Sequence, residues 1–473
     1  MNQAFDVVIV GNGAIGTYMA CKFIEADPNL KVALVGPKDR RNSASTAAGA
    51  MANVFAETEK SYSMKGKLTS EKYLEMGVSG SVKWKKFLEK YDHDGNVMCA
   101  RDTIVFLKDG ASEFEKSNYQ EMILKAKEYE VYEDISINEF SEMLPDATRI
   151  LSATKIRGEF SMDTFHLMKT MELFLIRNHV TLLDQEVKEV ISEESVCLLT
   201  DNSRIFSKRI VIAAGAVSQK ILSGVPIVPM LQGVGSAFLF KTQQLDLPKI
   251  FSSNVIRTVN RGGAQCGFHV VPRRDGYYLG AGNYITFPGE SDHRLETLRY
   301  LFQTLEFELI GKKVSYDLVG SMVKGHRPRS LDGVPLIGPL LSQPNIYIAT
   351  GTNRAGLTWA PRIAEDALNW LLNSEVDQFF DFCRPERSLY SYGTEQEALD
   401  YFIESRLGAA IEHKLIDQSY NGTQARRTEL HAVGIEMLKK SKISFSNKDF
   451  VPHPDHWAPI IESNSDCFGG YAI

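Results

Sequence analysis

The chain begins with an apolar strand, a glycine-rich turn and a helix, and this order limits its fold more than any other feature. Residues 5–10 read FDVVIV, a β-branched run typical of a buried strand. GNGAIG follows, and residues 17–26 have the periodicity of a helix that ends before Pro28. A second apolar run, KVALV at 31–35, completes a strand–helix–strand unit. We therefore predict a parallel sheet of the Rossmann type at the start of the chain.

The glycines of this turn have the GxGxxG spacing of a loop that binds the pyrophosphate of a dinucleotide. Gly11 permits the tight turn, Gly13 lets the backbone approach the phosphates, and Gly16 lets the helix pack on the strand. The positive end of the helix dipole also favours an anion. Because a strand precedes the motif and a helix and a second strand follow it, we predict dinucleotide binding rather than a simple capping turn.

The acidic residue that binds the ribose hydroxyls, expected about 20 residues after such a loop, is absent. Gly36 occupies the position, and the chain continues as PKDRR. Lys38, Arg40 and Arg41 could bind the 2′-phosphate of NADP. Asp39 or backbone groups could instead hold the ribose of another dinucleotide. These residues alone leave both alternatives open.

Composition excludes other classes of protein. The 473 residues carry a formal net charge of −6, which disfavours a nucleic-acid surface. The six cysteines form no CxxC pair, which argues against a metal site and a disulfide framework and favours a reducing compartment. No apolar run approaches the about 18 residues of a membrane helix, and residues 1–10 lack the pattern of a signal peptide. We therefore expect a cytoplasmic protein without a membrane span or a bound metal ion, either monomeric or homo-oligomeric.

Further motifs occur in order along residues 5–388. They are SASTAAGAMAN at 43–53, GEFSMDTFHLMKTM at 158–171, EVKEV at 186–190, VIAAGAVS at 211–218, GFHVVPRRDGYYLGAG at 267–282, HRPRSLDGVPLIGP at 326–339 and ATGTNRAGLTWAP at 349–361. Together with GNGAIG they resemble the motifs of the D-amino-acid oxidase, glycine oxidase and sarcosine oxidase family. These enzymes use FAD, so the resemblance implies FAD, rather than NADP, as the dinucleotide.

The resemblance implies an α/β and α+β fold with two domains before a C-terminal extension. A discontinuous, Rossmann-like FAD-binding domain would comprise residues 1–80, 150–235 and 325–387. A substrate domain built on an antiparallel sheet would comprise residues 81–149 and 236–324.

Residues 388–473 have no counterpart in the shorter relatives. Their pattern predicts helices as far as about residue 440, followed by a polar end that contains PHPDHWAP. Leu399, Phe402 and Ile403 need burial, so we expect this C-terminal extension to form a helical cap or a subunit contact.

The resemblance also implies which residues hold FAD. The attachment would be non-covalent, because no histidine lies near the 43–53 turn and Gly325 stands at the family's cysteine position. The expected cofactor residues are Gly11, Gly13, Ala14, Ile15, Gly16, Asp39, Ser43, Ser45, Thr46, Ala48, Gly49, Met51, Val187, Ala214, Gly215, Arg327, Arg354, Ala355, Gly356, Leu357 and Thr358. Asn53 would lie beside Met51 against the flavin.

Three side chains are candidates for substrate binding and catalysis. Arg327 stands where relatives bind a substrate carboxylate, a task suited to a planar guanidinium, although a surface ion pair or a guanidinium turned to backbone carbonyls is the alternative. His269 replaces a tyrosine of relatives that bind amino acids, and its alternative is a packed, hydrogen-bonded side chain. Arg354 precedes a helix N-terminus and would face either the substrate or the domain interface. Arg329 is expected to be structural or solvated.

The implied reaction is oxidation of a C–N bond in an amino acid, or in another amine that carries a carboxylate. A hydride would pass to flavin N5, and water would hydrolyse the imine. Tyr277 and Tyr278 stand where some relatives have a lysine that helps oxygen to react, so the acceptor is either O2 or an electron carrier.

Two other functions compete with amine oxidation. The first is a 2-hydroxy-acid or alcohol dehydrogenase of the same fold, with His269 as the base and an electron carrier as the acceptor. The second is an inactive flavin-binding assembly subunit. The intact Arg327 and the GTNRAG motif argue against this second alternative.

Overall fold

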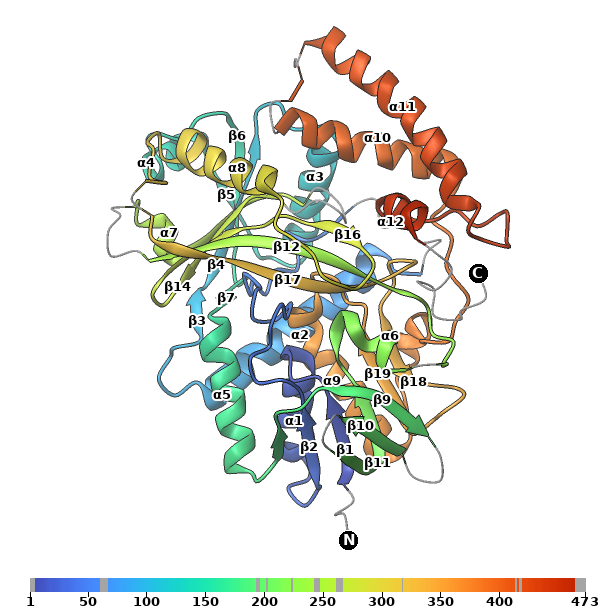
Figure 1. Cartoon of the computed structure of the whole chain (residues 1–473). Coiled ribbons are helices and arrows are strands. Elements are labelled where there is room, and N and C mark those ends of the chain that lie inside the picture. Colours follow the sequence, from blue (N-terminus) through green and yellow to red (C-terminus); the bar gives the residue numbers. More distant parts are fainter. Residues whose placement is uncertain are drawn as a thin grey trace.

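The predicted strand–helix–strand unit forms the centre of the first of two large sheets (Figure 1). Strand β1 (Phe5–Val10) leads into helix α1 (Ala14–Ala26), and β2 (Val32–Val35) returns parallel to β1. These limits confirm the predicted ones to within a few residues. The computed structural model describes residues 5–59, 67–192, 196–200, 203–222, 224–241, 247–260, 267–316, 318–412, 415–416 and 419–463.

Five parallel strands make up the core of this first sheet, sheet A, in the order β19-β11-β1-β2-β8. The three further parallel strands are β8 (Thr181–Leu183), β11 (Arg204–Ile212) and β19 (Ile346–Thr350). Strand β18 (Leu336–Pro339) pairs antiparallel with β19, while β9 (Val187–Ser192) and β10 (Val196–Thr200) extend β11 into an antiparallel meander. The predicted Rossmann-type parallel sheet is therefore confirmed.

Alternate residues of β1 enter two different cores. Val7 and Ile9 pack with helices α1, α2 (Ser70–Tyr91), α5 (Thr164–Arg177) and α9 (Gly356–Asn373). Val8 and Val10 pack on the opposite face with Ile221, the last residue of the short helix α6 (Ser218–Ile221), and with apolar residues that follow it, among them Val228 and Leu231. Both faces of β1 are thus covered, which explains why the strand is apolar at every position from Val7 to Val10.

The second sheet, sheet B, lies across the carboxyl ends of the parallel strands (Figure 1). Its strands are β4 (Asp102–Lys108), β5 (Tyr132–Ile135), β6 (Ile150–Ile156), β12 (Met230–Lys241), β13 (Asn254–Thr258), β14 (His269–Arg273), β15 (Gly276–Gly280), β16 (Tyr284–Thr286) and β17 (Gly320–Ser330). All its pairs are antiparallel except β4 with β13. The predicted hairpin of residues 267–282 is confirmed as β14 and β15.

Short helices pack against sheet B. They are α3 (Glu113–Glu128), α4 (Ile137–Met143), α7 (Ile250–Ser253) and α8 (Leu295–Gln303), and a small pair of strands, β3 (Met98–Ala100) and β7 (Ser161–Met162), lies beside the sheet.

The predicted domain limits stay a prediction. Strand β6 falls within the segment 150–235 that was expected in the FAD-binding domain, yet it pairs with β4 and β5 in sheet B.

The C-terminal extension forms helices α10 (Glu395–Glu412), α11 (Tyr420–Lys442) and α12 (Trp457–Glu462), which lie at one corner of the molecule (Figure 1). Leu399, Phe402 and Ile403 are buried, as their sequence pattern requires. The ring of Phe402 stacks on Trp457 with 5.0 Å between centroids. The extension therefore buries these three apolar side chains against its own chain.

Phe402→Ala tests whether the extension belongs to the cooperative core. The side chain is 1% exposed, and we expect its truncation to lower the free energy of unfolding by about 3–5 kcal/mol. Urea denaturation followed by fluorescence measures this change. Ile443→Ala is the control, because its side chain is 76% exposed and the change should stay below about 0.5 kcal/mol. Equal losses of unfolding free energy in the two variants would contradict the placement of the extension in the cooperative core.

Candidate active site

A cavity of about 440 Å³ lies where the two sheets meet. The carboxyl ends of β1, β2, β11 and β19 reach it from sheet A, and residues of β12, β13, β14, β15 and β17 reach it from sheet B. The ends of parallel strands are where open α/β sheets bind their ligands. The cavity is therefore the candidate active site.

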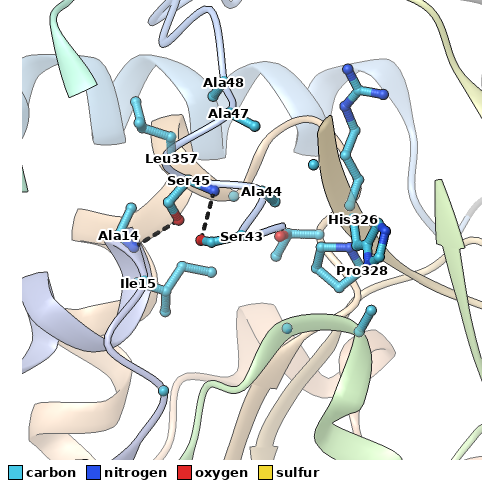
Figure 2. Close-up of a pocket in the computed structure, with 18 of the residues that line it drawn as sticks. Ala14, Ile15, Ser43, Ala44, Ser45, Ala47, Ala48, His326, Pro328 and Leu357 are labelled. Carbon is cyan, nitrogen blue, oxygen red and sulfur yellow. Dashed lines mark hydrogen bonds between the residues drawn. The ribbon is translucent and has the colours of Figure 1, made fainter. Parts of the chain in front are cut away.

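At the turn after β1, the backbone of glycine residues forms part of the cavity wall. Gly11 has φ +110°, and a Cβ there would collide with the carbonyl oxygen of Ala213. The Ala14 amide at the start of α1 donates to Ser45 Oγ at 2.9 Å, and the Ser45 amide donates to Ser43 Oγ at 3.2 Å (Figure 2). These hydrogen bonds hold the 43–48 segment against the N-terminus of α1.

Asn12 fills the space of the missing acidic residue. A Cβ at Gly36 would lie 2.7 Å from Asn12 Cγ, and Asn12 Nδ2 donates to the Pro37 carbonyl at 2.9 Å. Both Asn12 and Gly36 line the cavity. The sequence pattern did not relate Gly36 to Asn12, whereas the structure shows that the small size of Gly36 accommodates the Asn12 side chain.

The expected ribose contact of Asp39 is not what the structure shows. Asp39 is exposed, lies outside the cavity lining, and accepts a hydrogen bond from the Arg41 amide at 3.3 Å. Arg40 Nε donates to the Asn12 carbonyl at 2.9 Å, and its terminal nitrogen pairs with Glu172. The Arg40 guanidinium is thus held by protein groups, while the Asp39 carboxylate turns back to its own loop.

The cavity collects most of the expected cofactor residues. Those that line it are Gly11, Gly13, Ala14, Ile15, Ser43, Ser45, Ala48, Gly49, Met51, Val187, Ala214, Gly215, Arg327, Arg354, Ala355, Gly356, Leu357 and Thr358. Gly16, Asp39 and Thr46 do not. Gly16 instead packs α1 against the Gly11 carbonyl, where a Cβ would collide, and Thr46 is exposed.

Two asparagines carry buried polar atoms that no described residue satisfies. Both Oδ1 and Nδ2 of Asn53, and Oδ1 of Asn353, are buried without a hydrogen-bond partner. Both side chains line the cavity. An unsatisfied buried polar group costs about 1–3 kcal/mol, so these atoms fit a ligand with donors and acceptors along its edge, as a flavin ring has.

The Arg354 guanidinium is held at the interface between the sheets. Nη1 donates to Asn260 Oδ1 at 2.6 Å, Nη2 donates to Glu59 Oε1 at 3.0 Å, and Nε lies 3.3 Å from Glu57 Oε2. Of its two expected roles, the structure thus favours the domain interface, although the residue also lines the cavity.

Glu57 is shared between Arg354 and a second arginine that sequence reasoning missed. Arg257 Nη1 donates to Glu57 Oε1 at 2.6 Å. Burial raises the pKa of Glu57, but the two guanidiniums outweigh it and lower the pKa to about 2. Glu57 is therefore an anion within the cavity wall. The single charge inside the otherwise uncharged run NVIRT of β13 is the signal that could have identified Arg257.

His269 projects from the middle of sheet B. It lies directly across from Arg257 in the β13–β14 ladder, and its ring stacks on Tyr278 with 5.7 Å between centroids. Burial, together with the positive charges of Arg257 and Arg327, lowers the pKa of His269 to about 3. The imidazole is therefore neutral at physiological pH.

Arg327 rests on a glycine of the neighbouring strand. A Cβ at Gly235 would lie 2.5 Å from Arg327 Nη2, so a larger residue would displace the guanidinium. Arg327 Nη1 donates to the Gly282 carbonyl at 3.1 Å and to Asn283 Oδ1 at 3.0 Å. Within the described residues no carboxylate pairs with Arg327, which leaves its other nitrogens for a ligand.

Arg329, two residues further along β17, is buried beneath the C-terminal extension. Its Nε donates to His456 Nε2 at 2.6 Å, and Nη2 lies 3.2 Å from His453 Nε2 and 3.8 Å from Asp455 Oδ2. Its backbone bridges Thr352 in the loop before α9. The expected structural role of Arg329 is confirmed, and its partners come from the PHPDHWAP segment.

Neither a metal site nor a membrane-spanning helix is found where the structure describes the chain. No group of three or more histidine, cysteine, aspartate or glutamate side chains is placed to hold an ion. No helix in those ranges combines the length and the apolar character that crossing a bilayer requires.

Solved structures share this fold at low sequence identity. Iminodiacetate oxidase from Chelativorans sp. BNC1 superposes with a TM-score of 0.64 and 16% identity over 80% of this chain and 98% of its own. FAD-bound L-alpha-glycerophosphate oxidase from Mycoplasma pneumoniae superposes with a TM-score of 0.61 and 18% identity over 82% and 98%, respectively. The predicted combination of a Rossmann-like domain and an antiparallel sheet is thus confirmed.

Sequence comparison identifies the family. Glycine oxidase of Pseudomonas aeruginosa is 26% identical over 167 residues, which are 35% of this chain and 42% of that relative. The chain therefore aligns with less than half the length of this curated relative. The family model described as FAD dependent oxidoreductase matches residues 6–370, more than three quarters of the chain. The predicted family and its cofactor FAD are confirmed, and the chain belongs to the FAD-dependent oxidoreductases of the D-amino-acid oxidase family.

Proposed function

We propose that this FAD enzyme oxidises a C–N bond in an amine that carries a carboxylate. The observation that carries the proposal is Arg327, a half-buried guanidinium in the cavity wall with no carboxylate partner among the described residues. A planar fork of donors binds a carboxylate through two parallel hydrogen bonds. Arg327 would thus orient the substrate by its carboxylate.

The cofactor would be held by groups that the structure leaves available. The N-terminus of α9, without a side-chain cap, presents backbone amides of Gly356, Leu357 and Thr358 at the cavity. Asn53 and Asn353 add polar side-chain atoms. When bound, FAD supplies the two-electron acceptor of the reaction. The positive end of α9 would favour negative charge beside it, and non-covalent attachment stays a prediction.

The remaining residues would position the substrate and exclude water. His269 and Tyr278 form part of the cavity floor in sheet B, where a neutral imidazole can make one hydrogen bond to a substrate without repelling a cation. Oxidation next to nitrogen requires a free lone pair, so the amine must be neutral. Holding the C–H bond in a reactive orientation would be the main contribution of these side chains.

Oxidation of an alcohol is the second candidate, because L-alpha-glycerophosphate oxidase shares the fold. An alcohol needs a base for its hydroxyl proton, and His269 is the nearest candidate. A pKa of about 3 makes His269 a weak base at neutral pH, which favours the amine. The unpaired atoms of Asn53 argue against an inactive assembly subunit, since they fit a site built for a ligand.

Arg327→Ala tests the carboxylate contact. We expect the apparent dissociation constant of a carboxylate substrate to rise at least about tenfold, because a charge-assisted pair in a shielded cavity is lost. Rapid-mixing measurements of flavin reduction against substrate concentration report this constant. FAD content should stay unchanged, and Arg327→Lys should restore binding only in part because an ammonium lacks the planar fork. Unaltered concentration dependence in the alanine variant would contradict the proposal.

The pH dependence of flavin reduction tests the role of His269. A pKa of about 3 keeps the imidazole neutral above about pH 5, so we expect no inflection from His269 between about pH 5 and 8. The rate should follow deprotonation of the substrate amine instead. His269→Gln should change substrate affinity but leave the shape of the profile intact. An inflection in that range that disappears in the variant would make His269 the base and favour an alcohol.

Gly36→Ala tests the Asn12 arrangement. The added Cβ would displace the Asn12 side chain from Pro37, and we expect FAD affinity to fall about tenfold, or about 1.4 kcal/mol. Titration of the apoprotein with FAD, followed by quenching of flavin fluorescence, gives the dissociation constant. Gly289→Ala is the control, because a Cβ there meets nothing within 4 Å. Tighter FAD binding in Gly36→Ala would show that the space is free.

A further inference from the structure

We propose that Arg257 binds a second anionic group of the substrate, so that the preferred substrates are amines with two acidic groups, such as amino dicarboxylates. This inference rests on the proposed function, in which Arg327 binds the first carboxylate. It assigns a ligand to an arginine that the reaction itself does not require.

Arg257 is placed to face a substrate. It lies directly across from His269 in the ladder between β13 and β14, so both side chains point to the same face of sheet B. Both line the cavity, as does Arg327 of β17. Arg257 is 2% exposed, which means that any ligand that reaches it does so within a cavity shielded from bulk water.

The guanidinium retains donors for a ligand. Its Nη1 donates to Glu57 Oε1 at 2.6 Å, and Nε donates to the Thr258 carbonyl at 3.1 Å. Arginine has five N–H donors, and in the described part of the chain Nη2 has no protein partner. The same carboxylate, Glu57, also serves Arg354 through its other oxygen. Glu57 therefore fixes the Arg257 guanidinium in place without using both of its terminal nitrogens.

The charges at this end of the cavity call for more than one negative group. Three guanidiniums, those of Arg257, Arg327 and Arg354, line it together with the single carboxylate of Glu57. Two buried carboxyl groups lie outside the lining: Glu59, behind Arg354, whose pKa burial raises, and Glu159, whose pKa burial raises to about 7. Burial, and then the charges of Arg257 and Arg327, lower the pKa of His269, while Arg354 and Arg257 lower the pKa of Glu57 against the effect of burial. A substrate carboxylate bound at Arg327 leaves the positive charge of Arg257 only partly compensated. A second acidic group on the substrate would complete this compensation.

Binding of inert acids by the FAD-loaded enzyme tests the inference without requiring turnover. We will compare malonate, succinate and glutarate with acetate and propionate, using the perturbation of the flavin absorption spectrum. At least one diacid should bind about tenfold or more tightly than the monoacids, and Arg257→Gln should abolish that advantage while it leaves the monoacids unchanged. Equal binding of diacids and monoacids in the parent would overturn the inference, as would equal losses of both in the variant.

Oxidation assays then compare amine substrates under the same conditions. The panel is glycine and N-methylglycine against iminodiacetate and both enantiomers of aspartate and glutamate. For the best diacid, kcat/KM should fall about 30-fold or more in Arg257→Gln, while the monoacids change little. If diacids bind through Arg257 but no amine reduces the flavin, the second anionic subsite stands and the proposed reaction fails. If monoacids are the better substrates of the parent, the reaction stands and the subsite fails.

Matched variants separate binding from folding. Arg274→Gln removes an exposed arginine of the adjacent hairpin that donates to the backbone carbonyls of Asn96 and Met98, and it should change neither measurement. Arg257→Lys keeps the positive charge beside Glu57 and should retain part of the diacid preference. If Arg257→Gln folds poorly, the double variant Arg257→Gln, Glu57→Gln replaces it, because it removes both charges of the ion pair. The double variant should bind FAD and should still lose the preference for diacids.

Discussion

A single buried carboxylate, Glu57, connects three parts of the chain that approach the cavity from different directions. One oxygen binds Arg257 of β13 and the other faces Arg354 before α9. Glu57 itself follows the segment that covers the start of α1. In a shielded interior, loss of one partner from such a group costs about 3–5 kcal/mol. The spacing between sheet A and the floor of sheet B is therefore fixed by ionic contacts as well as by apolar packing.

This arrangement divides the arginines of the cavity by task. Arg354 is saturated by Glu57, Glu59 and Asn260, so it stabilises the interface. Arg327 rests on Gly235 and, among the residues that the structure describes, is oriented by Gly282 and Asn283. The number of protein partners, rather than the residue type, separates a structural arginine from one that can bind a ligand.

The sequence predicted the parts of the fold that depend on local pattern. The apolar run of β1, the GxGxxG turn and the periodicity of α1 each follow from neighbouring residues, so the first unit was placed to within a few residues. Family resemblance then located most of the cavity lining, because its motifs lie at strand ends and helix starts, and those ends meet in one place.

Contacts between distant segments could not be predicted in the same way. Arg257 and Glu57 are 200 residues apart, and an apolar run with one charge does not reveal which carboxylate will face it. Gly36 looked like a lost ribose contact because Asn12, which takes the space beside it, belongs to a different loop. Asp39 had the right chemistry, but the geometry of its loop turns it to the Arg41 amide.

The burial of Arg329 beneath the C-terminal extension has a consequence for how the protein is made. Its partner His456 lies 127 residues further along the chain. At about 5–20 residues per second, a ribosome needs roughly 6 to 25 s to synthesise that interval. Once β19 has been synthesised, the nascent chain contains every strand of both sheets that the structure describes, yet it lacks the groups that stabilise the buried charge next to the cavity. The surroundings of Arg329 are therefore completed only after both sheets have been synthesised, and a nascent chain that stalls in this interval presents a buried arginine without its partners to the chaperones and proteases of the cell.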